Sequence, residues 1–158
     1  MNEDSEGSEG AHPYPCIRCE LSCESEYLVG APVLVEFSLR NESSEPIAIL
    51  RWCTPLEGFT CDMFDLRRDG EPVRYCGILA KRGDPMASEY VIVEPSECLD
   101  VVFDMREGYE VDEIGRYHAR YRTRVHDWAF SHEAVPRTRN LHRSYDLDCG
   151  ALTWSVVG

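Results

Sequence analysis

The chain has 158 residues, a length typical of one domain with a single core. Its formal net charge of −13 at pH 7 argues against binding to nucleic acid, because phosphates require a concentrated basic surface. No apolar run approaches the roughly 18 residues needed to cross a bilayer, so the sequence predicts no membrane span.

The first fifteen residues are acidic and rich in glycine and serine, and they end in a proline-rich stretch at 12–15. Such a composition buries too little apolar surface to fold, so residues 1–15 are predicted to be a disordered acidic tail. Residues 16–158 are then expected to form a single domain.

Two features of the sequence give opposite indications of the cellular compartment. The N-terminus has neither the basic nor the apolar region of a secretory signal, which makes the cytoplasm the default. Eight cysteines, however, are a count more typical of compartments in which disulfides persist. The cysteines therefore favour a secreted or periplasmic protein, and both possibilities stay open at this point.

Three cysteines lie close together at the start of the domain. Cys16, Cys19 and Cys23 contain a Cys-x2-Cys spacing, which could supply half of a tetrahedral thiolate site for zinc. A second pair of ligands at comparable spacing is missing, so we favour disulfides or free thiols here. We predict no metal site and no cofactor. Ile17 to Ser25 otherwise suits a first, edge-like strand.

Alternation with a period of two begins at Val33, where apolar residues at 33, 35, 37 and 39 share one face. Turn residues follow at 41–46, and a second strand is predicted at 47–52. We interpret the two strands as a hairpin. The pattern breaks at 54–58, and Cys53 and Cys61 flank the break; they are the preferred disulfide pair if the compartment is oxidising.

The next connection, Tyr75 to Pro85, contains Lys81, the only lysine among sixteen basic residues. Its glycines and proline favour a turn between strands. Loops on a rigid scaffold commonly carry binding function, so this loop is the first candidate site. It also contains the tripeptide Arg82-Gly83-Asp84 known from adhesion ligands, although three residues match by chance too easily to carry that function.

Two more strands are predicted at 89–93 and 99–105, again as a pair around a turn. The most regular alternation follows. One face of residues 116–124 is basic, and on so acidic a protein we interpret it as a solvated face paired with neighbouring carboxylates. The basic residues are Arg116, His118, Arg120, Arg122 and Arg124.

Residues 126–148 lack periodicity and are predicted to be a long loop, the second candidate site. Alternation returns at 152–156. About seven or eight short strands, with no helical period over ten or more residues, predict an all-β, immunoglobulin-like antiparallel sandwich.

Catalytic motifs are missing. His132-Glu133 begins like a zinc-protease helix, but Pro136 stands where the second histidine is required. The sequence has neither a Gly-x-Ser-x-Gly elbow nor a phosphate-binding glycine loop. We therefore predict that the chain is not an enzyme.

Several segments together resemble the N-terminal propeptide region of bacterial deuterolysin-like, peptidyl-Lys zinc metalloendopeptidases. The resemblance covers roughly residues 33–125. Its more unusual pieces are Trp52-x-Thr-Pro-Leu-Glu-Gly58 and Lys81-Arg-x-x-Pro85. The other matching segments are 39–41, 75–77, 90–91 and 115–117.

The resemblance implies an immunoglobulin-like prodomain that assists folding of a protease and blocks its active site. The His-Glu-x-x-His helix of the family's catalytic domain has no counterpart in these residues. Without that helix, the resemblance implies a domain that inhibits a separate protease molecule in trans, or a repurposed binding domain. The expected partner is a zinc metalloendopeptidase.

Two functional hypotheses follow. The first is a non-enzymatic protein-binding domain, a metalloprotease inhibitor or prodomain-like chaperone. The alternative is a structural or adhesion module that takes part in assembly. For the first hypothesis, the contact residues are expected to be Ala80, Lys81, Arg82, Gly83, Asp84 and Pro85.

Overall fold

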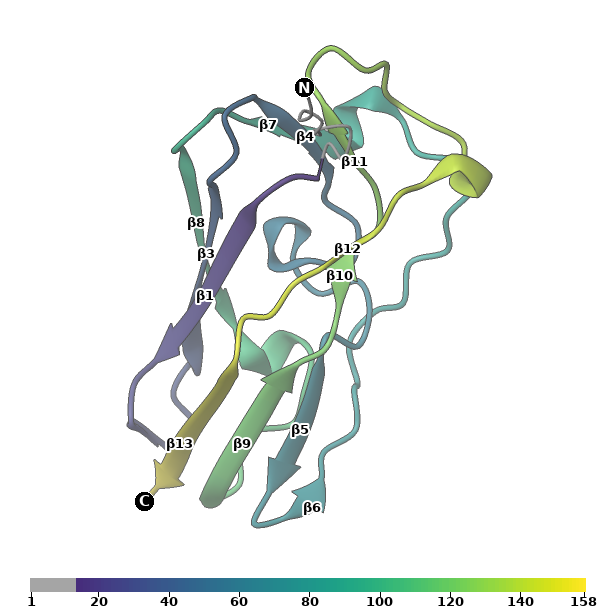
Figure 1. Cartoon of the computed structure of the whole chain (residues 1–158). Helices are drawn as coiled ribbons and strands as arrows, with labels where there is room; N and C mark the ends of the chain where they lie inside the picture. Colours follow the sequence, from purple (N-terminus) through teal and green to yellow (C-terminus); the bar gives the residue numbers. More distant parts are fainter. Residues whose placement is uncertain (1–13) are drawn as a thin grey trace.

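A computed structural model describes residues 14–158 of the chain (Figure 1). Most of the predicted tail, residues 1–13, lies outside the described residues. Its last two residues lie against the domain, since Pro15 is buried and the Tyr14 ring stacks near Trp128 at a centroid distance of 6.4 Å.

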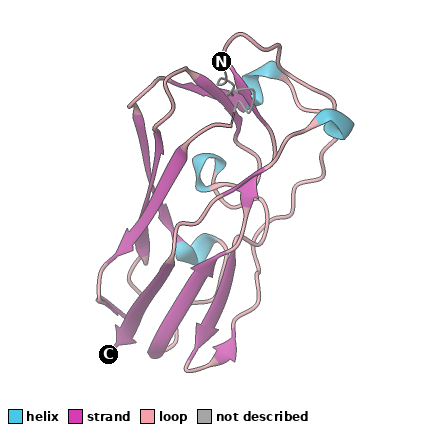
Figure 2. Cartoon of the chain, viewed as in Figure 1, coloured by secondary structure: helices cyan, strands magenta, loops and turns pink. Residues whose placement is uncertain are grey.

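The described residues form thirteen strands and four short 3₁₀ helices, η1 to η4 (Figure 2). The strands are β1 (Ile17–Cys23), β2 (Glu26–Leu28), β3 (Leu34–Asn41), β4 (Ile47–Leu50), β5 (Phe64–Arg68), β6 (Glu71–Pro72), β7 (Tyr90–Val93), β8 (Cys98–Asp104), β9 (Gly115–Tyr121), β10 (Arg124–Val125), β11 (Trp128–Phe130), β12 (Tyr145–Asp146) and β13 (Ala151–Val157). The helices are η1 (Pro55–Glu57), η2 (Ala87–Glu89), η3 (Met105–Glu107) and η4 (Arg139–Leu141).

The strands form two main layers (Figure 1). One layer is the sheet β1-β3-β8, and the other is the sheet β2-β13-β9-β5-β6. All pairs in these sheets are antiparallel except β2 with β13. Of the two smaller sheets, β11-β4-β7 lies at the upper end of the domain in Figure 1, and β10-β12 lies near its middle. The predicted all-β antiparallel architecture is confirmed.

The predicted hairpins are wrong. β3 pairs with β8, and β4 pairs with β7, with Arg40 opposite Cys98 and Ile47 opposite Val93. The chain therefore continues in one direction from β3 to β4. The reason lies at the buried Asn41, whose Nδ2 donates to the carbonyls of Glu45 and Val93, both at 2.9 Å. These bonds close residues 41–45 as a local excursion, so the segment does not reverse the strand.

Aromatic side chains fill the space between the two layers. The Phe37 ring of β3 lies 6.2 Å from the Tyr121 ring of β9, between centroids. Within the second layer, Tyr117 and Trp154 are opposite each other in the β9–β13 register and stack at 5.3 Å. Aromatic pairs of this kind contribute about 0.5–1.5 kcal/mol each beyond their burial. The alternation predicted for β9 and β13 thus places their apolar faces in the core.

The structure contains two disulfides, one local and one between distant parts of the chain. The predicted Cys53–Cys61 bond is present and closes the loop that contains η1. The other bond joins Cys19 of β1 to Cys149, just before β13. Cys19 is therefore unavailable as a zinc ligand, and Cys16 and Cys23 carry free thiols. Two disulfides fit an oxidising compartment.

Within residues 14–158, none of the helices has the length and apolar character of a membrane-spanning segment.

Candidate functional site

The segment that follows Tyr75 is held against the framework along its first half. Tyr75 forms a bridge to Tyr109, and the Cys76 amide donates to the carbonyl of Gly108 at 2.8 Å. The Tyr75 hydroxyl donates to the carbonyl of Ile78 at 2.5 Å. Further on, the Ala80 amide donates to the carbonyl of Thr60 at 3.0 Å. The backbone at 75–80 is therefore tied to neighbouring segments at Cys76 and at Ala80, and the Tyr75–Ile78 bond closes it internally.

Gly77 lies at the closest approach of this segment to its neighbours. A Cβ atom at this position would lie 2.6 Å from the Tyr75 hydroxyl oxygen and 2.9 Å from the carbonyl oxygen of Glu107. Real Cβ atoms do not approach other atoms so closely. The tight turn before Ile78 therefore depends on a glycine here.

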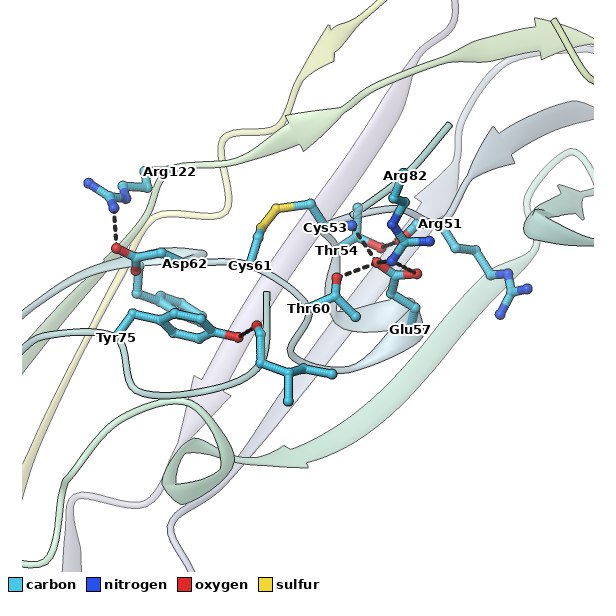
Figure 3. The surroundings of a disulfide bond; sticks show 12 residues. Arg51, Cys53, Thr54, Glu57, Thr60, Cys61, Asp62, Tyr75, Arg82 and Arg122 are labelled. Carbon is cyan, nitrogen blue, oxygen red and sulfur yellow. Dashed lines mark hydrogen bonds and ion pairs between the residues drawn. A yellow bond between two sulfur atoms is a disulfide. The ribbon is translucent and has the colours of Figure 1, made fainter. Parts of the chain in front are cut away.

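Arg82 is the central anchor of the loop (Figure 3). One guanidinium nitrogen donates to both carboxylate oxygens of Glu57, at 2.9 and 2.8 Å. Another donates to Oε2 of Glu89 at 3.1 Å. The guanidinium carbon also lies 4.9 Å from the centroid of the Trp52 ring. With its side chain only 20% exposed, Arg82 faces inward and is not presented to solvent.

Glu57 and Glu89, the two carboxylates that bind Arg82, are positioned by further hydrogen bonds. Glu57 also accepts from the Cys53 amide at 2.7 Å and from the Thr60 hydroxyl at 2.5 Å, within the loop closed by the Cys53–Cys61 disulfide (Figure 3). Glu89 accepts from the Met86 amide and the Trp52 indole nitrogen. The Met86 amide is the main cause that lowers the pKa of Glu89, and the Trp52 bond and the Arg82 charge add to it.

The second half of the loop contacts residues of the other candidate segment. Oδ1 of Asp84 accepts from the amide of Arg139 at 2.9 Å. The Arg139 guanidinium donates to the carbonyl of Arg82, also at 2.9 Å. Pro85 is buried. The two segments singled out in the sequence therefore meet in space, and they form one surface at the end of the domain.

Between these anchors the loop exposes a short row of side chains. Ile78 is 68% and Leu79 is 72% exposed, and Lys81 is exposed without a carboxylate within 4.0 Å in the part of the chain that the structure describes. Of the six predicted contact residues, Ala80, Lys81, Gly83 and Asp84 are exposed. Ile78 and Leu79 lie within the predicted loop 75–85 but outside the predicted contact residues 80–85, although two adjacent large apolar residues in a turn-rich loop were a usable signal.

Residues 126–148 are more ordered than the predicted long loop. They contain β11, which pairs with β4, and β12, which pairs with β10. The segment is anchored by Asp127, whose side chain is fully buried. Its carboxylate accepts from the Arg137 guanidinium at 2.5 Å and from the Tyr90 hydroxyl at 2.6 Å. No periodic pattern in the sequence identified this anchor.

The ionisation of Asp127 follows from these contacts. Burial acts to raise the pKa of its carboxyl group, but hydrogen bonds from Arg137, Tyr90 and the Arg143 amide outweigh burial and hold the pKa below its usual range. The pKa of Tyr90 is raised, by burial first and then by its bond to the Asp127 carboxylate. Asp127 is therefore charged at neutral pH and forms a buried ion pair with Arg137.

The basic face of β9 and the following residues is only partly paired with carboxylates. Arg122 forms an ion pair with Asp62. Arg120 lies opposite Asp65 in the β5–β9 register. Among residues 14–158, however, Arg116, Arg120 and Arg124 have no carboxylate oxygen within 4.0 Å of their side-chain nitrogens. The expected pairing thus holds for Arg122 alone among these arginines.

Comparison with known proteins identifies a similarity to a protease. No protein-family model matches the chain. A stretch of 89 residues, 56% of this chain, is 32% identical to a protein from Aeromonas hydrophila described as an extracellular protease. The match covers 25% of that protein, so this chain spans about a quarter of the relative's length. The similarity indicates a protease-related region in this chain.

Proposed function

We propose that the chain is a non-enzymatic, prodomain-like domain that binds a protease through the loop centred on Lys81. The observation that carries this proposal is the loop itself. Its backbone and Arg82 are fixed to the framework, while Ile78, Leu79 and Lys81 are exposed to a partner. The proposed contact surface keeps the exposed residues 80, 81, 83 and 84 of the predicted set, adds residues 78 and 79, and leaves out the inward-facing Arg82 and the buried Pro85.

A braced loop suits tight docking for a thermodynamic reason. Ordering a flexible side chain at an interface costs roughly 0.5–1.5 kcal/mol, and ordering of the loop backbone adds to that cost. Here the Glu57, Glu89 and Arg139 contacts already restrict residues 80–84 before any partner binds. Lys81 could then enter an acidic specificity pocket while its two apolar neighbours cover the rim.

The class of partner is inferred from similarity. The relative from Aeromonas hydrophila is described as an extracellular protease, and the sequence resembles prodomains of zinc metalloendopeptidases. We therefore propose a zinc metalloendopeptidase as the partner, an immunoglobulin-like classification of the sandwich, and a secreted or periplasmic location. Within this proposal the domain inhibits the protease or assists its folding.

The adhesion reading of Arg82-Gly83-Asp84 receives no support from the geometry. The Arg82 guanidinium is bound to Glu57 and Glu89, and the Asp84 carboxylate accepts from Arg139. An adhesion ligand would have to release both groups before it could present them. The tripeptide instead acts as an anchor of the loop.

The test is inhibition of a peptidyl-Lys zinc metalloendopeptidase, measured with a fluorogenic peptide substrate. The chain is expected to inhibit, and Lys81→Ala is expected to weaken inhibition by tenfold or more, because a charge-assisted contact is lost. Arg18→Ala is the matched control, since it removes an exposed cation from β1. Equal inhibition by the wild-type chain and Lys81→Ala would overturn the assignment of the contact to this loop.

A further inference from the structure

A small pocket lies behind the loop, between the disulfide-closed segment 53–61 and residues 137–143. Its volume is about 230 Å³. A neighbouring pocket shares Cys53 and His126 with it and is lined by Arg122 and Arg124. The wall of the first pocket contains two arginines, Arg82 and Arg139, two histidines, His126 and His142, and the aromatic surface of Trp52, and none of its lining residues is acidic.

This positive lining is unusual on a protein with a net charge of −13. The charge of Arg82 is balanced by Glu57 and Glu89. Arg139 is not balanced in this way, because no carboxylate oxygen of residues 14–158 lies within 4.0 Å of its guanidinium nitrogens, and one of them donates to the Arg82 carbonyl. The pocket therefore contains an unneutralised guanidinium.

His126 lies in the wall of the same pocket. Its Nδ1 atom is buried and has no hydrogen-bond partner among the described residues. Burial lowers the pKa of His126, and the charges of Arg124, His142 and Arg139 lower it further, while Glu57 opposes them.

We propose that this pocket binds a carboxylate group, such as the side chain of a glutamate or aspartate in a partner protein. Drug-sized ligands need roughly 300–1,000 Å³, so a pocket of 230 Å³ suits a single side chain. A planar guanidinium matches the two oxygens of a carboxylate, and Trp52 can cover the methylene groups. This inference does not rest on the proposed inhibition of a protease.

The test uses the full chain with isotope-labelled histidine, observed by NMR at constant ionic strength. The probe is N-acetylglutamate methylamide, and its neutral counterpart is N-acetylglutamine methylamide. Only the acid is expected to shift the His126 and His142 ring signals saturably, with a Kd in the millimolar range typical of single-group contacts. Arg139→Gln is expected to weaken binding about tenfold.

Controls fix the location and the chemistry. Arg18→Gln on β1 is expected to leave the affinity unchanged, and His126→Gln is expected to weaken binding as seen at His142, with the fold checked by circular dichroism. Equal shifts with the neutral compound, or no effect of Arg139→Gln, would overturn the proposal. Tighter saturable binding of inorganic phosphate would also overturn it, because the pocket would then be a phosphate site.

Discussion

Arg82 and Glu57 are joined by two hydrogen bonds, at 2.9 and 2.8 Å, across 25 residues of sequence. This pair connects the exposed loop to the segment closed by the Cys53–Cys61 disulfide. The loop is therefore held by a side chain of the 53–61 segment. Its rigidity can be tested by substitutions that leave the exposed Ile78, Leu79 and Lys81 unchanged.

Arg82→Gln is expected to destabilise the domain by about 1–3 kcal/mol, because it leaves two partly buried carboxylates without their cation. The free energy of unfolding in urea measures this loss. Hydrogen exchange of the amides at 77–86 is expected to become faster. Arg18→Gln, which removes the exposed ion pair with Glu42, is the control, with an expected change of roughly 0–1 kcal/mol. Similar losses in both variants would contradict the anchoring role of Arg82.

Removal of the Cys53–Cys61 bond by double alanine substitution is expected to cost about 2–3 kcal/mol, the entropy of closing a short loop. Because Glu57 lies within this loop, amide exchange at 77–86 is expected to rise as well. The control is the double variant Cys19→Ala/Cys149→Ala. It is expected to lower global stability without a selective rise in exchange at 77–86.

Gly77→Ala is expected to destabilise the chain by roughly 1–3 kcal/mol, because the new methyl group would overlap the Glu107 carbonyl oxygen at 2.9 Å. The midpoint of urea unfolding measures the effect. Gly83→Ala is the matched control in the same loop. Nothing lies within 4 Å of its added Cβ, so the expected change is within about 0.5 kcal/mol. A neutral Gly77→Ala would show that this turn adjusts freely.

Acidification is expected to remove the stabilisation that Asp127 provides. Its pKa in the folded chain is lowered, so the contribution is fully present above the ordinary value of about 3.9. It is lost as the pH falls through the lower folded-state pKa. Asp127→Asn is expected to cost roughly 3 kcal/mol at pH 7, because Arg137 loses its buried partner.

Thermal unfolding of both proteins between pH 7 and pH 2 checks this expectation. The difference in stability between the wild-type chain and Asp127→Asn is expected to shrink below about pH 4. A difference that stays constant down to pH 2 would show that the Asp127 charge does not contribute.

The sequence predicted the strands more successfully than their partners. Alternation identifies which face of β9 or β13 is buried, because adjacent side chains of a strand point to opposite sides. It carries no information about which strand lies alongside. The hairpins at 33–52 and 89–105 were wrong for this reason, since the local bonds of Asn41 that keep β3 and β4 in one direction cannot be read from turn composition.

The candidate site was predictable in position and not in its contacts. Turn residues and a solitary lysine located the loop. The engagement of Arg82 depends on Glu57, and that of Asp84 depends on Arg139, 55 residues away. Of the two disulfides, likewise, only one was predictable from the sequence. Cys53 and Cys61 flank one break in the pattern, whereas Cys19 and Cys149 meet only after the two sheets have assembled.

The Cys19–Cys149 bond spans 130 residues and so encloses the exposed loop. A protease that cleaved the peptide bond after Lys81 would produce two fragments that remain covalently joined. The first fragment would retain β2 and β3, and the second would retain β8 and β13. The strand pairs β3–β8 and β2–β13 would therefore also join the two fragments. Cleavage would then yield a nicked domain instead of released pieces, and a non-reducing gel would show one band where a reducing gel shows two.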